Sequence, residues 1–204
     1  MELTIIPFFK TNNMRTYQVV TAASTYPVTT SEAKTHLKVD TSADDTYIDN
    51  IIKAATQLSE EYTNRFFIDT VIEQTCSSFA DLQTLFKSKV NTVTHVKYYD
   101  SDNSLQTLDA TVYDTQLDYE PSQIQLAENQ SFPDITKRND AVVAKYTVGY
   151  GSAASDVPEV IKQAILLTIG NFYQNRASVI TGKTATELPM NVKWLLNTYK
   201  VQTV

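Results

Sequence analysis

The stretch from Asp156 to Ala177 constrains the fold more than any other, because the helix that it predicts is apolar on nearly every side. Between Ala164 and Ile169 only Thr168 is polar. A helix of this kind belongs either to a protein core or to a membrane span. The apolar run is far shorter than the ~20 residues that cross a bilayer. The stretch therefore predicts a central helix around which other helices pack.

Two further helices are predicted on the N-terminal side of the chain. Thr29 and Glu32 have the spacing of a capping box, which predicts a short helix after Thr29. From Ile48 to Phe66 apolar residues recur at steps of three and four, the pattern of an amphipathic helix. Asp44 or Asp45 is expected to cap this second helix.

The C-terminal third is also expected to be helical. Pro158 occupies a place that the first turn of a helix tolerates, with Ser155 or Asp156 as its cap. Residues 178–188 are expected to form a flexible polar loop, and Pro189 opens a final helix. The sole tryptophan lies on that helix, where it fits either core packing or a contact with a partner. The expected apolar face comprises Val192, Trp194, Leu195, Leu196 and Tyr199.

Between the helical parts, from Asp69 to Tyr150, the apolar pattern changes to the period of two that is typical of strands. The turn-rich residues 100–103 join two such strands and predict a hairpin. We therefore expect an α+β fold, a helical bundle with an inserted antiparallel β subdomain. The expected division is an N-terminal arm at 1–28, the bundle at 29–68 and 156–204, and the β subdomain at 69–155.

Charge is unevenly distributed along this chain of 204 residues and net charge −6. Between Tyr98 and Asp140 there are nine carboxylates and two basic residues, a net charge of −7. Such a segment is a solvated β-rich region, or an acidic face that repels DNA or docks on a basic partner. The single cysteine, Cys76, cannot form an internal disulfide, which fits an intracellular or assembled-particle setting.

Known catalytic and ligand-binding motifs are missing from the sequence. Gly182-Lys183-Thr184 ends like a phosphate-binding loop, but it follows a predicted helix and lacks the earlier glycine. His36 and His95 are the two histidines, too few to suggest a metal site. We therefore expect no enzyme activity, no metal and no cofactor.

The order of several short motifs resembles the tailed-phage head–tail connector family, also called head-completion or adaptor proteins. It is similar to the longer members, which carry a β insertion between the helices. The motifs lie at 14–20, 27–29, 32–34, 37–40, 44–45, 51–55, 61–65, 148–151, 157–158, 161–167 and 172–176.

This resemblance implies a structural virion protein at the head–tail interface, present in the host cytoplasm during assembly. Its members form a ring, expected to be dodecameric, that binds the portal protein and a tail-side connector or stopper. DNA is expected to pass through the channel without sequence-specific binding, and no membrane is involved. The C-terminal segment is expected to contact the portal, with Trp194 and Tyr199 as candidates, and to become ordered on binding.

Two expectations stand beside this interpretation. Residues 1–13 precede the start that is usual in the family, and the candidate contacts of such an arm are Ile5, Phe8 and Phe9. The alternative function is a small-molecule or carbohydrate-binding module in the β subdomain.

Overall fold

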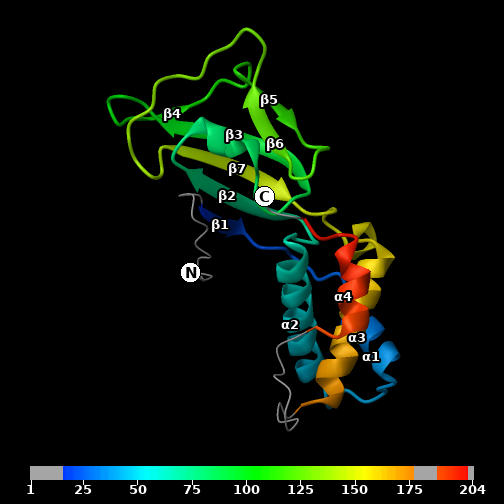
Figure 1. The fold of residues 1–204 in the computed structure, drawn as a ribbon. Helices are drawn as coiled ribbons and strands as arrows, with labels where there is room; N and C mark the ends of the chain where they lie inside the picture. The colour runs from blue at the N-terminus through cyan, green and yellow to red at the C-terminus, as the bar shows by residue number, and fades with distance from the viewer. Residues whose placement is uncertain (1–15, 177–187, 202–204) are drawn as a thin grey trace, which may run out of the picture. The chain divides into compact units, whose positions relative to one another are not determined.

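The computed structural model describes residues 16–176 and 188–201 (Figure 1). These residues form helices, one five-stranded sheet and a separate hairpin, which confirms the α+β fold class. The helices are α1 (Thr30–Leu37), α2 (Asp45–Thr63), α3 (Glu159–Gln174) and α4 (Met190–Asn197), with short 3-10 turns η1 (Phe79–Gln83) and η2 (Ala154–Asp156). The strands are β1 (Thr16–Thr21), β2 (Thr70–Cys76), β3 (Val90–Tyr99), β4 (Leu105–Thr107), β5 (Tyr113–Gln116), β6 (Gln123–Leu126) and β7 (Val142–Val148).

Contacts divide these residues into two compact units. The sheet unit contains residues 16–23, 69–150 and residue 201. The helical unit contains residues 24–68, 151–176 and 188–200. Of the segment 1–28, for which an arm is expected, Thr16–Thr21 forms an edge strand paired with β2.

In the helical unit, α2 and α3 each contact all the other described helices. The side of α3 that carries Ile161, Ile165 and Ile169 is fully buried, whereas Leu166 is only half-buried. The predicted central helix is therefore real, but it shares the centre of the bundle with α2.

Some ends of the helices lie where the sequence predicts them, and others do not. Thr29 and Glu32 form the predicted capping box: Thr29 Oγ1 accepts from the Glu32 amide at 3.2 Å, and the Glu32 carboxylate accepts from the Thr29 amide at 2.7 Å. Helix α2 ends at Thr63, not Phe66, because Asn64 adopts a left-handed conformation with φ 55°. Such a residue closes a helix by binding its last carbonyls.

The cap expected for α2 is confirmed in its position only, and the cap expected for α3 was wrong. Asp44 is the N-cap residue of α2, but its side chain makes no capping hydrogen bond. Pro158 is the N-cap residue of α3 and has no capping side chain. Asp156 instead closes the preceding turn η2, where its carboxylate accepts from the Ala153 amide at 3.0 Å. Proline fixes the backbone angle at a helix start and makes a side-chain cap dispensable there.

The five-stranded sheet has the order β1-β2-β7-β3-β4, and every pair is antiparallel (Figure 1). Strands β2 and β7 alternate strictly between buried and half-exposed side chains, so that only one face of the sheet forms a core. The predicted hairpin at residues 100–103 joins β3 and β4. Residues on the buried face include Ile72, Gln74, Cys76, Val96, Ala144 and Tyr146.

Two buried polar side chains tie a loop to this face. Tyr146 donates its hydroxyl to Gln74 Oε1 at 2.6 Å, and the amide of Phe86 donates to the same oxygen at 3.0 Å. Gln74 Nε2 donates to the carbonyl of Thr84 at 3.3 Å. Because buried polar groups are costly when unpaired, these bonds hold the segment after η1 in one place on the sheet.

Candidate functional site

Trp194 is the largest exposed apolar side chain on the described helices, with 76% of its surface accessible. Met190, one turn earlier on α4, is 86% accessible. Val192 and Leu196 on the opposite side of the helix are fully buried. Residues four positions apart share one side of a helix, so Met190 and Trp194 form one exposed apolar pair. The core-packing interpretation of Trp194 is therefore wrong, and the contact interpretation remains.

Side-chain bonds fix the end of α4 against α2. Tyr62 donates its hydroxyl to Asn197 Oδ1 at 2.6 Å, and Arg65 Nε donates to the carbonyl of Tyr199 at 2.5 Å. Lys200 Nζ lies 4.8 Å from the centre of the Tyr62 ring. These bonds make α4 part of the helical unit.

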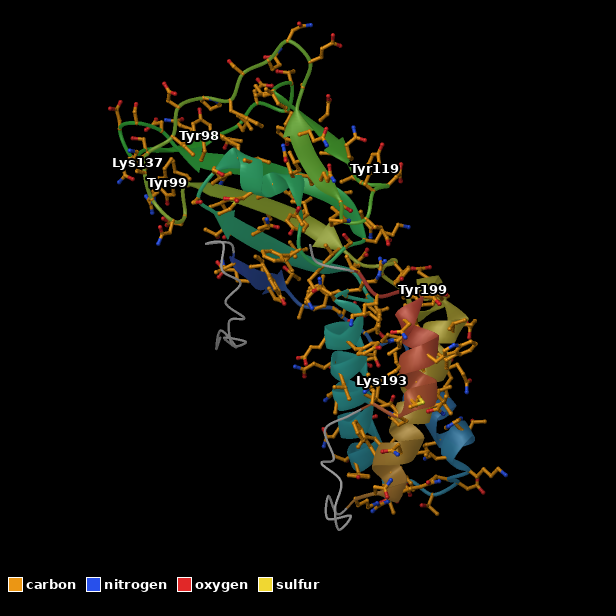
Figure 2. The ribbon with its side chains drawn as sticks, viewed as in Figure 1. Tyr98, Tyr99, Tyr119, Lys137, Lys193 and Tyr199 are labelled. Carbon is orange, nitrogen blue, oxygen red and sulfur yellow. The ribbon has the colours of Figure 1, made fainter. Side chains whose placement is uncertain are left out.

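Tyr199, the second candidate, differs from Trp194. Its side chain is half-exposed in the turn that follows α4, and its carbonyl is bonded to Arg65 (Figure 2). The hydrogen bond at Tyr199 is thus made by its backbone, and the more exposed Trp194 is the better candidate for a contact with a partner. The arm candidates Ile5, Phe8 and Phe9 and the loop 178–187 lie outside the described residues.

A second cluster, which the sequence analysis did not predict, lies at the other end of α3. Arg176 forms a salt bridge with Asp44 at 2.8 Å, and its guanidinium centre lies 4.6 Å from the rings of both Tyr47 and Tyr173. Tyr173 donates its hydroxyl to the same carboxylate. The Tyr173 hydrogen bond, together with Arg176, lowers the pKa of Asp44. We call these four side chains the Arg176 cluster, and they join the C-terminal end of α3 to the start of α2.

In the sheet unit, a long loop between β6 and β7 is held at one end of the sheet. Arg138 stacks on the ring of Tyr99 at 3.6 Å and donates two hydrogen bonds to Asp140. Phe132 from the same loop stacks on Phe79 at 4.3 Å. Figure 2 shows Tyr98, Tyr99 and Lys137 at this end of the sheet. The acidic segment between Tyr98 and Asp140 is therefore held against the sheet unit by contacts with aromatic rings.

The described residues offer no arrangement typical of catalysis or metal binding. Within them, no group of three or more His, Cys, Asp or Glu side chains is placed to hold a metal ion. His36 is exposed on α1 in the helical unit, and His95 is half-buried on β3 in the sheet unit. Cys76 is buried in the sheet. The Gly182-Lys183-Thr184 motif is outside the described residues, and none of the helices that the structure describes is long and apolar enough to cross a bilayer.

Comparison with protein families identifies one match. Residues 28–126 match the family model described as "Phage gp6-like head-tail connector protein". The matched region runs from the residues before α1 to the end of β6. Comparison with curated proteins found no match.

Solved structures with a similar fold come from gene transfer agent (GTA) particles. One chain, from the virion of a native GTA particle, has a TM-score of 0.74 and 22% identity. A chain from the neck of a native GTA particle, computed with C12 symmetry, has a TM-score of 0.73 and 22% identity. A third, from the neck of an empty GTA particle computed with C6 symmetry, has a TM-score of 0.72 and 21% identity. Each match covers 92% of this chain and 96% of the other, so the similarity of fold extends over both units.

Proposed function

Because residues 28–126 match the phage head–tail connector family, we propose that the chain assembles as a ring between the portal of a phage-like head and the tail. The family is a structural one, so the chain is a virion protein of the head–tail interface and not an enzyme. The ring, its number of subunits and its partners are parts of the proposal. The same holds for a channel through which DNA passes without sequence-specific contacts.

The observation that carries this proposal is the exposed pair Met190 and Trp194 on a rigidly held α4. Tryptophan is enriched among the residues that dominate binding energy at protein interfaces. A side chain presented by a helix that is already folded loses little freedom on binding, which favours affinity. We propose that this pair contacts the portal, with Tyr199 holding the end of the chain in position.

The ring is supported by the symmetry of the similar neck structures. One of them was computed with C12 symmetry, which matches the dodecamer expected from the sequence. A repeated interface adds many copies of one contact, so a modest contact in each subunit suffices for a stable joint. The alternative function, a small-molecule or carbohydrate-binding module, is set aside because no feature of the described sheet unit favours it.

Electron microscopy of particles assembled without the protein tests the proposal. We expect DNA-filled heads that lack tails, and we expect purified protein added to such heads to restore tail attachment. Particles that carry normal tails in the absence of the protein would overturn the proposed function.

A further inference from the structure

The five-stranded sheet has one face on which no core forms. We call it the open sheet face and define it by half-exposed side chains of three adjacent strands. In the register of the sheet, Lys145 on β7 lies between Glu73 on β2 and His95 on β3. The residues of the open sheet face are Glu73, Thr75, His95, Lys97, Val143 and Lys145.

The open sheet face is weakly basic. It carries two lysines, Lys97 and Lys145, and one carboxylate, Glu73. Burial, with repulsion from the two lysines, lowers the pKa of His95, although Glu73 acts in the opposite direction. The imidazole is therefore neutral at pH 7.

A strongly acidic surface lies on the other side of the same unit. We call it the acidic layer and define it by the exposed residues Asp114, Asp118, Tyr119, Glu120, Glu128 and Asp134. Tyr119 is 61% accessible in the loop before β6 (Figure 2). The acidic layer therefore combines several carboxylates with one exposed aromatic side chain.

The hairpin of β5 and β6 places this layer opposite the open sheet face. Ile124 points inward from the hairpin and is buried, while Asp114 and its register partner Gln125 lie on the outer side. The amide of Leu85 donates to the carbonyl of Ser122 at 2.9 Å, which joins the hairpin to the loop that covers the buried face. The outer side of the hairpin, with Asp114, thus lies on the opposite side of the sheet unit from the open sheet face.

We propose that the open sheet face of one copy docks on the acidic layer of the next copy. The inference rests on the ring assembly proposed above and assigns two surfaces to its subunit interface. Rings are built from two different patches that meet head to tail, whereas a two-fold dimer joins a patch to itself. Acidic layers that met each other would repel, while the lysines of the open sheet face complement them. Tyr119 supplies an aromatic contact of the kind that dominates interface energy.

Charge sets the orientation of this contact more than its strength, because exposed ion pairs are screened by water and salt. An experiment that links the two surfaces covalently is therefore a more specific test of this contact than a measurement of affinity. Disulfide crosslinking is suitable, since Cys76 is the sole cysteine and is buried.

The experiment uses the full chain with Lys97→Cys and Asp114→Cys combined, oxidised at high protein concentration. Each copy then has one thiol on each surface, so head-to-tail contacts give a ladder of trimers and longer chains. Each single variant gives dimers at most. The matched control combines Asp114→Cys with Lys53→Cys, an exposed lysine on α2 in the helical unit. We expect ladders in the first pair that are roughly tenfold more abundant than in the control.

A second pair, Lys145→Cys with Asp118→Cys, repeats the test with different positions, and circular dichroism confirms that each variant is folded. Ladders in both test pairs support the proposal. Equal ladders in test and control pairs, or none in either test pair, would overturn it. Electron microscopy of the wild-type protein on portal-bearing heads separates the two proposals. Rings without ladders remove only this surface assignment, whereas an absence of rings removes ring assembly as well.

Discussion

Arg176 at the end of α3 forms a salt bridge with Asp44 at the start of α2, with 2.8 Å between Nη2 and Oδ2. Tyr173 donates its hydroxyl to the same carboxylate, and the pKa of Asp44 is lowered by that hydrogen bond first and by Arg176 second. These contacts join the C-terminal end of α3 to the N-terminal end of α2.

The lowered pKa of Asp44 predicts a loss of stability in acid. A carboxylate whose pKa is lower in the folded state stabilises the fold above its unfolded pKa. That contribution disappears as the pH falls through the lowered value, when protonation breaks the contacts to Tyr173 and Arg176. We expect acid unfolding of Asp44→Asn to show a weaker pH dependence below pH 4 than the wild type. The same acid dependence in the variant and the wild type would contradict this assignment.

The packing of α3 predicts that alanine substitution at two adjacent positions lowers the unfolding free energy by very different amounts. Ile165 is fully buried, so Ile165→Ala leaves a cavity and is expected to cost ~2–5 kcal/mol of unfolding free energy. Leu166 is half-buried, and Leu166→Ala should cost clearly less. Chemical denaturation, monitored by circular dichroism, measures the unfolding free energy of both variants. Equal losses at the two positions would contradict the described orientation of the helix.

The buried pair Gln74 and Tyr146 predicts a specific effect in the sheet unit. Tyr146→Phe removes the hydroxyl that donates to Gln74 Oε1, while the Phe86 amide still donates to that oxygen. We expect a loss of ~1–3 kcal/mol, the usual cost of an impaired buried hydrogen bond. The matched control is Tyr119→Phe, at a tyrosine of the same unit whose side chain is 61% exposed. A Tyr146→Phe protein as stable as this control would contradict the role of the pair.

The acidic surface predicts weak binding to DNA. Proteins bind duplex DNA mainly by neutralising phosphates with lysine and arginine, and the segment from Tyr98 to Asp140 has a net charge of −7. Fluorescence anisotropy with labelled duplex at physiological salt should therefore show little binding. A sub-micromolar affinity with a steep dependence on salt would contradict the expectation of a channel that does not grip DNA.

Much of the fold follows from the sequence, because periodicity and turn residues act locally. The spacing of Thr29 and Glu32 predicts the observed capping box, and the change to period two at Asp69 marks the start of β2 and the strands that follow it. What sequence reasoning missed depends on distant pairing. Asp44 looks like a helix cap, but it binds Arg176 and Tyr173, which lie more than a hundred residues away.

The candidate site could be predicted only in part. The sequence places Trp194 on an apolar helix, but Val192 and Leu196 fill the core and leave Trp194 outside. The four-residue spacing of Met190 and Trp194 was the available signal for a separate exposed side. Removing the chain after Pro189 would take away the buried Val192 and Leu196 and expose the bundle core, so point substitution is the better test of α4.

The effect of Trp194→Ala on particle joining tests the central claim most directly. Trp194 makes little contact within its own unit, so the variant should unfold at nearly the same temperature as the wild type. Tyr26→Ala, at another exposed aromatic residue of the helical unit, is the matched control. Added to heads that lack the protein, the wild type and the Tyr26→Ala variant should restore tailed, infectious particles. The folded Trp194→Ala protein should leave DNA-filled heads without tails, and normal tailed particles from it would contradict the proposed contact.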